Sequence, residues 1–147
     1  MKNHSALFKN KNIKISISDA YKIQSILTDL RIKRGEKVIG YKIGSISNET
    51  QKKYGFSYPA WGRLWENELH SNRIKLSKKN YSNPAMEAEF GIRFNRDLDP
   101  QKVNFEYVLA SIDSIHPIIE IHNLIFYGDK PYGAEPVSYT HLTLPTI

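Results

Sequence analysis

Apolar residues recur at helical spacing near the start of the chain. Four of them stand three or four positions apart: Ala20, Ile23, Leu27 and Leu30. Ser18 and Asp19 precede most of this run with side chains that cap helices, and Gly35 follows basic residues that suit a last turn. The pattern predicts a helix from these caps to about Arg34.

Alternation of apolar and other residues predicts strands in two further places. Residues 37–44 alternate so that Lys42 lies on one face between Gly40 and Gly44. Residues 86–94 give the clearest strand, and its non-apolar positions are Glu87, Glu89, Gly91 and Arg93. One face of this second strand is apolar and the other is ionic.

Cap and turn signals lie between these two strands. Asn48 has capping-box spacing to a glutamine three residues later, and Gly55 would end the short helix that follows. Pro59 and Gly62 indicate a turn-rich stretch over residues 58–64. The chain between the strands is therefore expected to form a short helix and then an irregular segment.

Further patterns complete the expected order of elements. Residues 73–76 and 115–121 are predicted as strands, and Asp99 and Pro100 between them signal a turn. After this turn, four apolar residues keep the spacing of an amphipathic helix: Phe105, Val108, Leu109 and Ile112. The order of helix, strand, short helix, two strands, helix and strand favours an α+β or mixed α/β fold.

Length and composition restrict the class of protein. The 147 residues suffice for one domain rather than two. The share of hydrophobic residues, 40%, and of charged residues, 24%, is typical of a globular protein and excludes a disordered or fibrous chain. No apolar stretch resembles a membrane span or a secretory signal. We therefore expect a cytoplasmic protein with no membrane partner.

The residue types also limit the chemistry. The absence of cysteine excludes disulfides, thiolate nucleophiles and cysteine-bound metals, so oxygen or imidazole would bind any metal. The net charge of +6 would suit a nucleic acid, an anionic membrane surface or a small anionic substrate. The basic residues form short clusters set well apart, without the aromatic pattern of a nucleic-acid surface. This distribution argues against a nucleic-acid partner.

Three glutamates form a candidate metal site. Glu87 and Glu89 are two positions apart on a predicted strand, so both project from one face, about 7 Å apart along the chain. Glu120 lies in the otherwise apolar segment 117–121, where an unpaired buried charge would be costly. Three carboxylates suit Mg²⁺ or Mn²⁺. Alternatively, Glu87 and Glu89 form the solvated face of an edge strand, and Glu120 pairs with a lysine.

Five short motifs follow one another along the chain. They are G-x-K-I-G from Gly40, P-x-W-G-x-L from Pro59, E-x-E from Glu87, the turn Arg96-Asp97-Leu98, and P-I-I-E-I from Pro117. In order and spacing they resemble the 2-keto-4-pentenoate hydratase branch of the fumarylacetoacetate hydrolase superfamily, from about residue 16 to 123. The resemblance implies an α+β fold, namely the N-terminal portion of a mixed β-sheet roll with flanking helices.

The resemblance also implies roles for individual residues. The glutamates of the candidate site would bind Mg²⁺ or Mn²⁺. Lys42 would lie near the substrate as an acid, a base or an anchor for its carboxylate, which suits the room that the neighbouring glycines leave. Ser45, Gly62 and Leu64 would contact the substrate. The alternative for Lys42 is an ordinary lysine of a strand.

Members of this branch are metal-dependent lyases. The resemblance implies a hydratase that adds water to a 2-hydroxy-dienoate or 2-oxo-enoate in aromatic-compound catabolism. A small anionic 2-oxo acid would be the substrate, and the full-length protein would form homo-oligomers. An unrelated alternative is a non-catalytic basic binding module, which would bind nucleic acid nonspecifically and with a steep salt dependence.

Three departures from the family pattern leave the reaction open. Ala60 stands where some hydratases have an acidic residue, and residues 45–47 replace a Leu-Thr-Ser-like sequence. His122 and Asn123 replace an acidic and arginine pattern. A 2-oxo acid decarboxylase or a C–C hydrolase of the same superfamily therefore remains an alternative.

The end of the chain departs from the family altogether. The match ends near Tyr132, and residues 137–147 resemble the translation of a sequencing adapter. We therefore expect a partial catalytic domain, residues 1–136, followed by an artificial tail, residues 137–147. On this interpretation the chain is an inactive N-terminal fragment of the enzyme.

Overall fold

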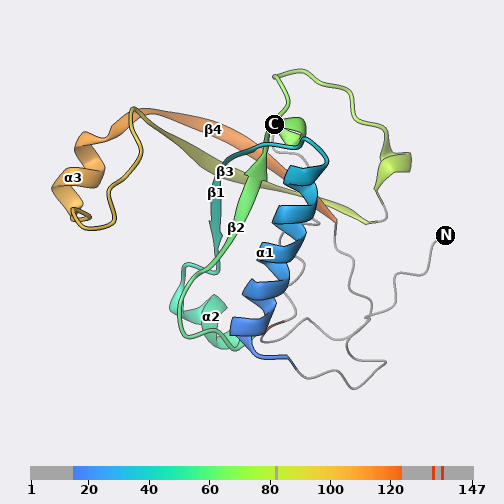
Figure 1. Cartoon of the computed structure of the whole chain (residues 1–147). Helices are drawn as coiled ribbons and strands as arrows, with labels where there is room; N and C mark the ends of the chain where they lie inside the picture. Colours follow the sequence, from blue (N-terminus) through green and yellow to red (C-terminus); the bar gives the residue numbers. More distant parts are fainter. Residues whose placement is uncertain (1–14, 82, 124–133, 135–136, 138–147) are drawn as a thin grey trace.

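The computed structural model describes residues 15–81, 83–123, 134 and 137 (Figure 1). Its order of elements is α1 (Ile17–Lys33), β1 (Val38–Gly44), α2 (Asn48–Tyr54), β2 (Ala60–Trp65), the 3-10 turns η2 (Glu66–Glu68) and η3 (Lys78–Asn80), β3 (Pro84–Phe94), α3 (Phe105–Ala110) and β4 (Ile112–Asn123). Helices and small antiparallel sheets together confirm the α+β class.

Helix α1 begins earlier than the sequence pattern indicates. Its N-cap is Ser16, whose Oγ accepts a hydrogen bond of 3.0 Å from the backbone N–H of Asp19. The prediction that Ser18 and Asp19 cap the helix is therefore wrong, because both lie within its first turn. Gly35, at a φ of +87°, follows the helix as predicted and takes a left-handed conformation that glycine adopts at no steric cost.

The buried side of α1 is largely polar. Ala20, Gln24 and Thr28 are buried at successive intervals of four residues, whereas Leu30 is half exposed. The Gln24 amide donates to the carbonyl of Trp61 at 3.0 Å, and the Thr28 hydroxyl donates to the carbonyl of Gln24 at 3.0 Å. Since these hydrogen bonds satisfy the buried amide and hydroxyl, α1 can pack against β2 along this stripe (Figure 1).

Strands β1 and β2 form one antiparallel ladder, with Lys42 opposite Gly62. The expectation of a turn-rich stretch over residues 58–64 is therefore wrong for the chain from Ala60 onward. Pro59 precedes the strand rather than interrupting it, and pairing with β1 satisfies the backbone. The strand expected at residues 73–76 does not form, because this segment pairs with neither ladder.

Helix α2 confirms its predicted end but not its cap. Its N-cap is Ser47 rather than Asn48, and the Ser47 Oγ accepts from the backbone N–H of Thr50 at 3.1 Å. Gly55 ends the helix at a φ of +73°. The polar residue that caps the helix thus lies one position before the residue that the spacing favours.

Strands β3 and β4 form the second antiparallel ladder, with α3 at the turn between them (Figure 1). Both strands are longer than the alternation predicts, and Pro117 lies opposite Phe90 within the ladder. The last turn of the predicted amphipathic helix is wrong, since α3 ends at Ala110 and Ile112 begins β4. On β3 one face carries the glutamates and the other carries the apolar residues, as the sequence pattern predicts, while β4 places Ile118 on the glutamate face opposite Glu89.

The apolar face of the β3–β4 ladder is exposed. Met86, Phe90, Ile115 and Ile119 on this face are 47–76% exposed, whereas Ile121 at one end of it is buried. Among the described residues, the buried cluster lies elsewhere and consists of Ala20, Phe56, Ala134 and Val137. The second ladder therefore presents to solvent the kind of surface that proteins usually bury against another layer.

One buried residue bears on the expected boundary between domain and tail. Val137, the first residue of the expected tail, is fully buried, while residues 138–147 lie outside the described part of the chain. A domain over residues 1–136 and a tail over residues 137–147 remain a proposal, and the packing of Val137 favours a domain that includes it. Among the described helices, none has the length and apolar character needed to cross a membrane.

A substitution on the apolar face should leave the fold intact. Replacement of Phe90 by lysine should reduce binding of an apolar fluorescent dye, because the side chain is 76% exposed. Circular dichroism should stay unchanged. Loss of strand signal in Phe90→Lys would show that the apolar face is already covered.

A buried side chain gives the contrast. Trp65→Ala, at a side chain that is 1% exposed, should cost about 3–5 kcal/mol of unfolding free energy.

Candidate functional site

Strand pairing brings the three candidate glutamates to one face of the β3–β4 ladder. Glu87 lies directly opposite Glu120, and Glu89 follows two residues later on the same face. One carboxylate oxygen of each residue lies within 4.8 Å of the others. Glu87 and Glu89 are exposed, whereas Glu120 is largely buried. We name this trio the glutamate cluster.

Lys42 joins the glutamate cluster from the other ladder. Its Nζ donates to Oε1 of Glu120 at 2.6 Å, and the two side chains are only 23% and 18% exposed. This ion pair links β1 to β4 across 78 positions of sequence. Glu120 therefore pairs with a lysine, as the alternative to a metal site predicts. It also has the two glutamate neighbours that the metal hypothesis requires.

The residues expected to contact a substrate lie around Lys42. Gly62 is opposite Lys42 and Leu64 is opposite Gly40, so alternation places both on the face of Lys42. A Cβ added at Gly44 would meet nothing within 4 Å, which shows that this face is open. Ser45 lies one residue past β1 at a φ of +55°, a conformation that few non-glycine residues adopt.

A second charged cluster lies beside Lys42, and no sequence pattern indicated it. Arg31 at the end of α1 contacts Glu36 at 2.6 Å and Glu68 at 2.7 Å. Its guanidinium lies 3.9 Å over the ring of Trp65. Arg31 looks like an ordinary basic residue of a last helical turn, and its partners lie outside the helix. Only the folded chain brings these groups together.

The two carboxylates bound to Arg31 respond in opposite directions. The hydrogen bond from Arg31 lowers the pKa of Glu36. Burial raises the pKa of Glu68 above its ordinary value, and the hydrogen bond and charge of Arg31 oppose this only in part. The charge of Lys42 also acts to lower the pKa of Glu68, which places this network close to Lys42.

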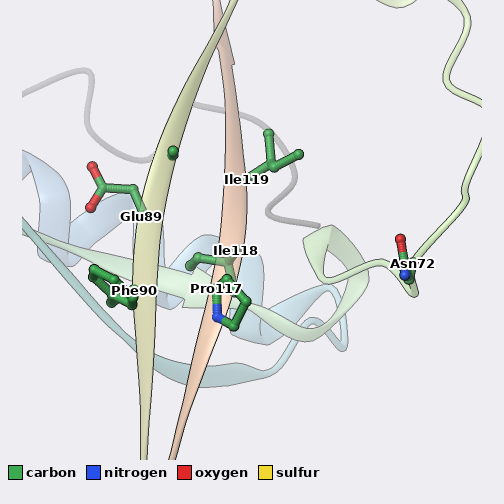
Figure 2. A pocket seen from close by; sticks show the side chains of 7 residues that line it. Asn72, Glu89, Phe90, Pro117, Ile118 and Ile119 are labelled. Atoms are coloured by element: carbon green, nitrogen blue, oxygen red, sulfur yellow. The ribbon is translucent and has the colours of Figure 1, made fainter.

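A cavity of about 490 Å³ adjoins the β3–β4 ladder (Figure 2). Its lining is mostly apolar and comes from β3, β4 and a loop residue: Ala88, Glu89, Phe90, Pro117, Ile118, Ile119 and Asn72. Alternation places Ala88 and Phe90 on the face opposite the Glu89 carboxylate. The lining also includes Glu89 and its cross-strand neighbour Ile118, so the cavity draws on residues of both faces of the ladder and adjoins the glutamate cluster at Glu89.

Known proteins resemble this chain in both sequence and structure, although no family model matches it. Over 107 residues it is 35% identical to the 2-keto-4-pentenoate hydratase of Paraburkholderia xenovorans, covering 73% of this chain and 40% of the relative. Over 135 residues it is 30% identical to the 2-keto-4-pentenoate hydratase of Paraburkholderia phymatum, covering 87% and 52%. The chain therefore spans about half, or less, of the length of these curated relatives.

Solved structures share the fold. The 4-oxalocrotonate decarboxylase of Pseudomonas putida G7, complexed with magnesium and adipate, superposes with a TM-score of 0.85 at 21% identity, over 95% of this chain and 53% of that chain. The same decarboxylase complexed with calcium and acetate gives 0.84 at 20% identity, over 97% and 53%. Sequence and fold together show that the chain belongs to the fumarylacetoacetate hydrolase superfamily, in the branch of the 2-keto-4-pentenoate hydratases.

The raised pKa of Glu68 predicts a specific dependence of stability on pH. A carboxyl whose pKa is higher in the folded state stabilises the fold while protonated, and this contribution is lost as the pH rises through the folded pKa. Glu68→Gln should therefore gain unfolding free energy relative to the unmodified chain between about pH 4 and pH 7.

Urea unfolding at several pH values measures this difference. The matched control is Glu66→Gln, which removes an exposed carboxylate from the same turn η2. It should gain little by comparison. A Glu68→Gln variant that loses stability at pH 7 relative to pH 4 would show that the ion pair with Arg31 outweighs burial.

Proposed function

We propose that this chain carries the metal-binding part of a hydratase that adds water to a 2-hydroxy-dienoate or its 2-oxo-enoate tautomer. The observation that carries the proposal is the convergence of Glu87, Glu89 and Glu120 within 4.8 Å, with Lys42 bonded to one of them. The identity of 35% to a 2-keto-4-pentenoate hydratase supports the choice of reaction.

The donor set fits a hard divalent cation. Oxygen ligands about 2.1 Å from an octahedral Mg²⁺ lie about 3–4 Å from one another, and those of Mn²⁺ lie slightly farther apart. The three carboxylate oxygens already lie within 4.8 Å of one another, so small side-chain rotations would bring them to the ligand spacing of such a cation. We therefore assign Glu87, Glu89 and Glu120 as ligands of Mg²⁺ or Mn²⁺.

The chemistry of the site would be shared between the cation and Lys42. A bound divalent cation supplies an electrophile for the oxygens of a 2-oxo acid. The Lys42 ammonium lies on the same side and can bind a substrate carboxylate or donate a proton. Gly62 and Leu64 would contact the substrate on that face, and Ser45 would do so from the end of β1.

The reaction needs no oxidant or reductant. One water adds across one carbon–carbon double bond, so that a hydroxyl group joins one carbon and a proton joins the other. Proton transfer by a positioned side chain is the kind of step that contributes about 10²–10⁴-fold to a rate. We assign Lys42 as the residue that holds that proton. Homo-oligomerisation of the full-length enzyme is part of the same proposal.

Removal of one cluster glutamate should strongly weaken metal binding. Loss even of an outer-shell partner typically weakens a metal site about 10–100-fold, so Glu89→Gln should weaken Mg²⁺ or Mn²⁺ binding at least 100-fold. Isothermal titration calorimetry measures this change. Glu106→Gln, which removes an exposed glutamate of α3, is the matched control and should bind as the unmodified chain does. Equal binding by both variants would show that the glutamate cluster does not bind the metal.

Substitution of Lys42 should slow the reaction. In a protein of the relatives' length that begins with residues 1–136, Lys42→Met should lower kcat/KM for 2-hydroxypenta-2,4-dienoate by about 10²–10⁴-fold, because it removes the proposed acid or anchor. Consumption of the dienoate is followed by its ultraviolet absorbance. Unchanged turnover would exclude Lys42 from the mechanism, and release of CO₂ from a 2-oxo diacid without hydration would favour the decarboxylase alternative.

A further inference from the structure

We propose that Lys42 acts as an exchangeable counter-ion of the glutamate cluster: it pairs with Glu120 when no divalent cation is bound and must leave Glu120 when one binds. The inference deepens the proposed function and rests on it, since it requires the same metal site. It adds an order of events, in which cation binding releases the ammonium that then binds the substrate.

The geometry of the ion pair is the first support. The Lys42 Nζ lies 2.6 Å from Oε1 of Glu120, and about four-fifths of each side chain is shielded from solvent. Water and salt screen such a pair much less than a surface pair, so its charges interact more strongly. Lys42 also brings one positive charge to a group of three carboxylates that otherwise repel one another.

Competition for Glu120 follows from this arrangement. A cation bound by all three glutamates takes an oxygen of Glu120, and its two charges repel an ammonium on the same carboxylate. Lys42 therefore opposes cation binding in two ways, by holding the ligand and by its own charge.

The released ammonium has a place to go. Lys42 shares its face with Gly62 and Leu64, and the space beyond Gly44 is open. An ammonium that has lost its carboxylate partner there suits the carboxylate of a 2-oxo acid. Because coupling between two ligands is reciprocal, the acid should in turn strengthen cation binding by drawing Lys42 away from Glu120.

The proposal predicts a gain of affinity from the loss of a site residue. Lys42→Met should tighten Mg²⁺ or Mn²⁺ binding by about tenfold, because it removes both the competitor and the repulsion. Lys42→Arg keeps the charge and should not tighten binding. Lys37→Met is the matched control, since Lys37 has the same charge but is 69% exposed and pairs with Glu66 at 3.3 Å. Its effect should stay below about twofold at physiological salt.

Two measurements on the 147-residue chain test the proposal. Isothermal titration calorimetry gives the cation affinity of each variant, with circular dichroism as the check on folding. In the unmodified chain, the nitrogen-15 resonance of the Lys42 side-chain ammonium should shift on addition of MgCl₂. This second readout needs no substitution, so it holds even if Lys42→Met fails to fold.

The possible outcomes separate the two proposals. Binding that is lost in Glu89→Gln but is equal or weaker in folded Lys42→Met would overturn the counter-ion role alone and leave the metal site standing. An ammonium resonance unmoved by saturating MgCl₂ would overturn it as well. If no form of the chain binds the cation, the metal site itself is wrong, and the counter-ion role falls with it.

Discussion

The ion pair between Lys42 and Glu120 is the contact that gives the two ladders of this chain a common site. β1 pairs with β2 and β3 pairs with β4 as two separate sheets, so in the described part of the chain no ladder hydrogen bond joins one sheet to the other. The side chains must therefore connect them. Lys42 of β1 does so through its shielded ion pair with Glu120 of β4. Glu120 lies opposite Glu87, so the same contact brings the face of β1 that carries Lys42 to the glutamate cluster, where the proposed chemistry takes place.

Local patterns predicted the parts of the fold that depend on neighbours in sequence. Alternation over residues 86–94 gave the strand and both of its faces, and Gly35 and Gly55 gave two helix ends. The strand at Ala60 was missed because its partner is β1, which no local signal reveals. The buried stripe of α1 was missed for the same reason, since Gln24 is polar and finds its hydrogen-bond partner 37 residues away.

The residues of the candidate site also fall into two groups: those that a local pattern predicts and those that only the folded chain brings together. The period of two in a strand predicts that Glu87 and Glu89 share a face. A charge in an otherwise apolar segment singles out Glu120, and the resemblance to the hydratases supports all three as ligands. The register that sets Glu120 opposite Glu87 is a property of the paired ladder and cannot be read from either strand alone. The Arg31 network lay outside any pattern, because its carboxylates come from segments after α1 and after β2.

The two-faced character of β3 has a consequence for how this gene can vary in length. Insertion of one codon ahead of Glu87 would turn the glutamates toward the apolar side of the ladder and the apolar residues toward Lys42. Insertion of two codons would restore the faces but move Glu87 away from Glu120 by one cross-strand pair. A point substitution changes one side chain of the site, whereas an insertion or deletion here changes the positions of several at once. The segment from Pro84 to Glu89 should therefore tolerate no change in length.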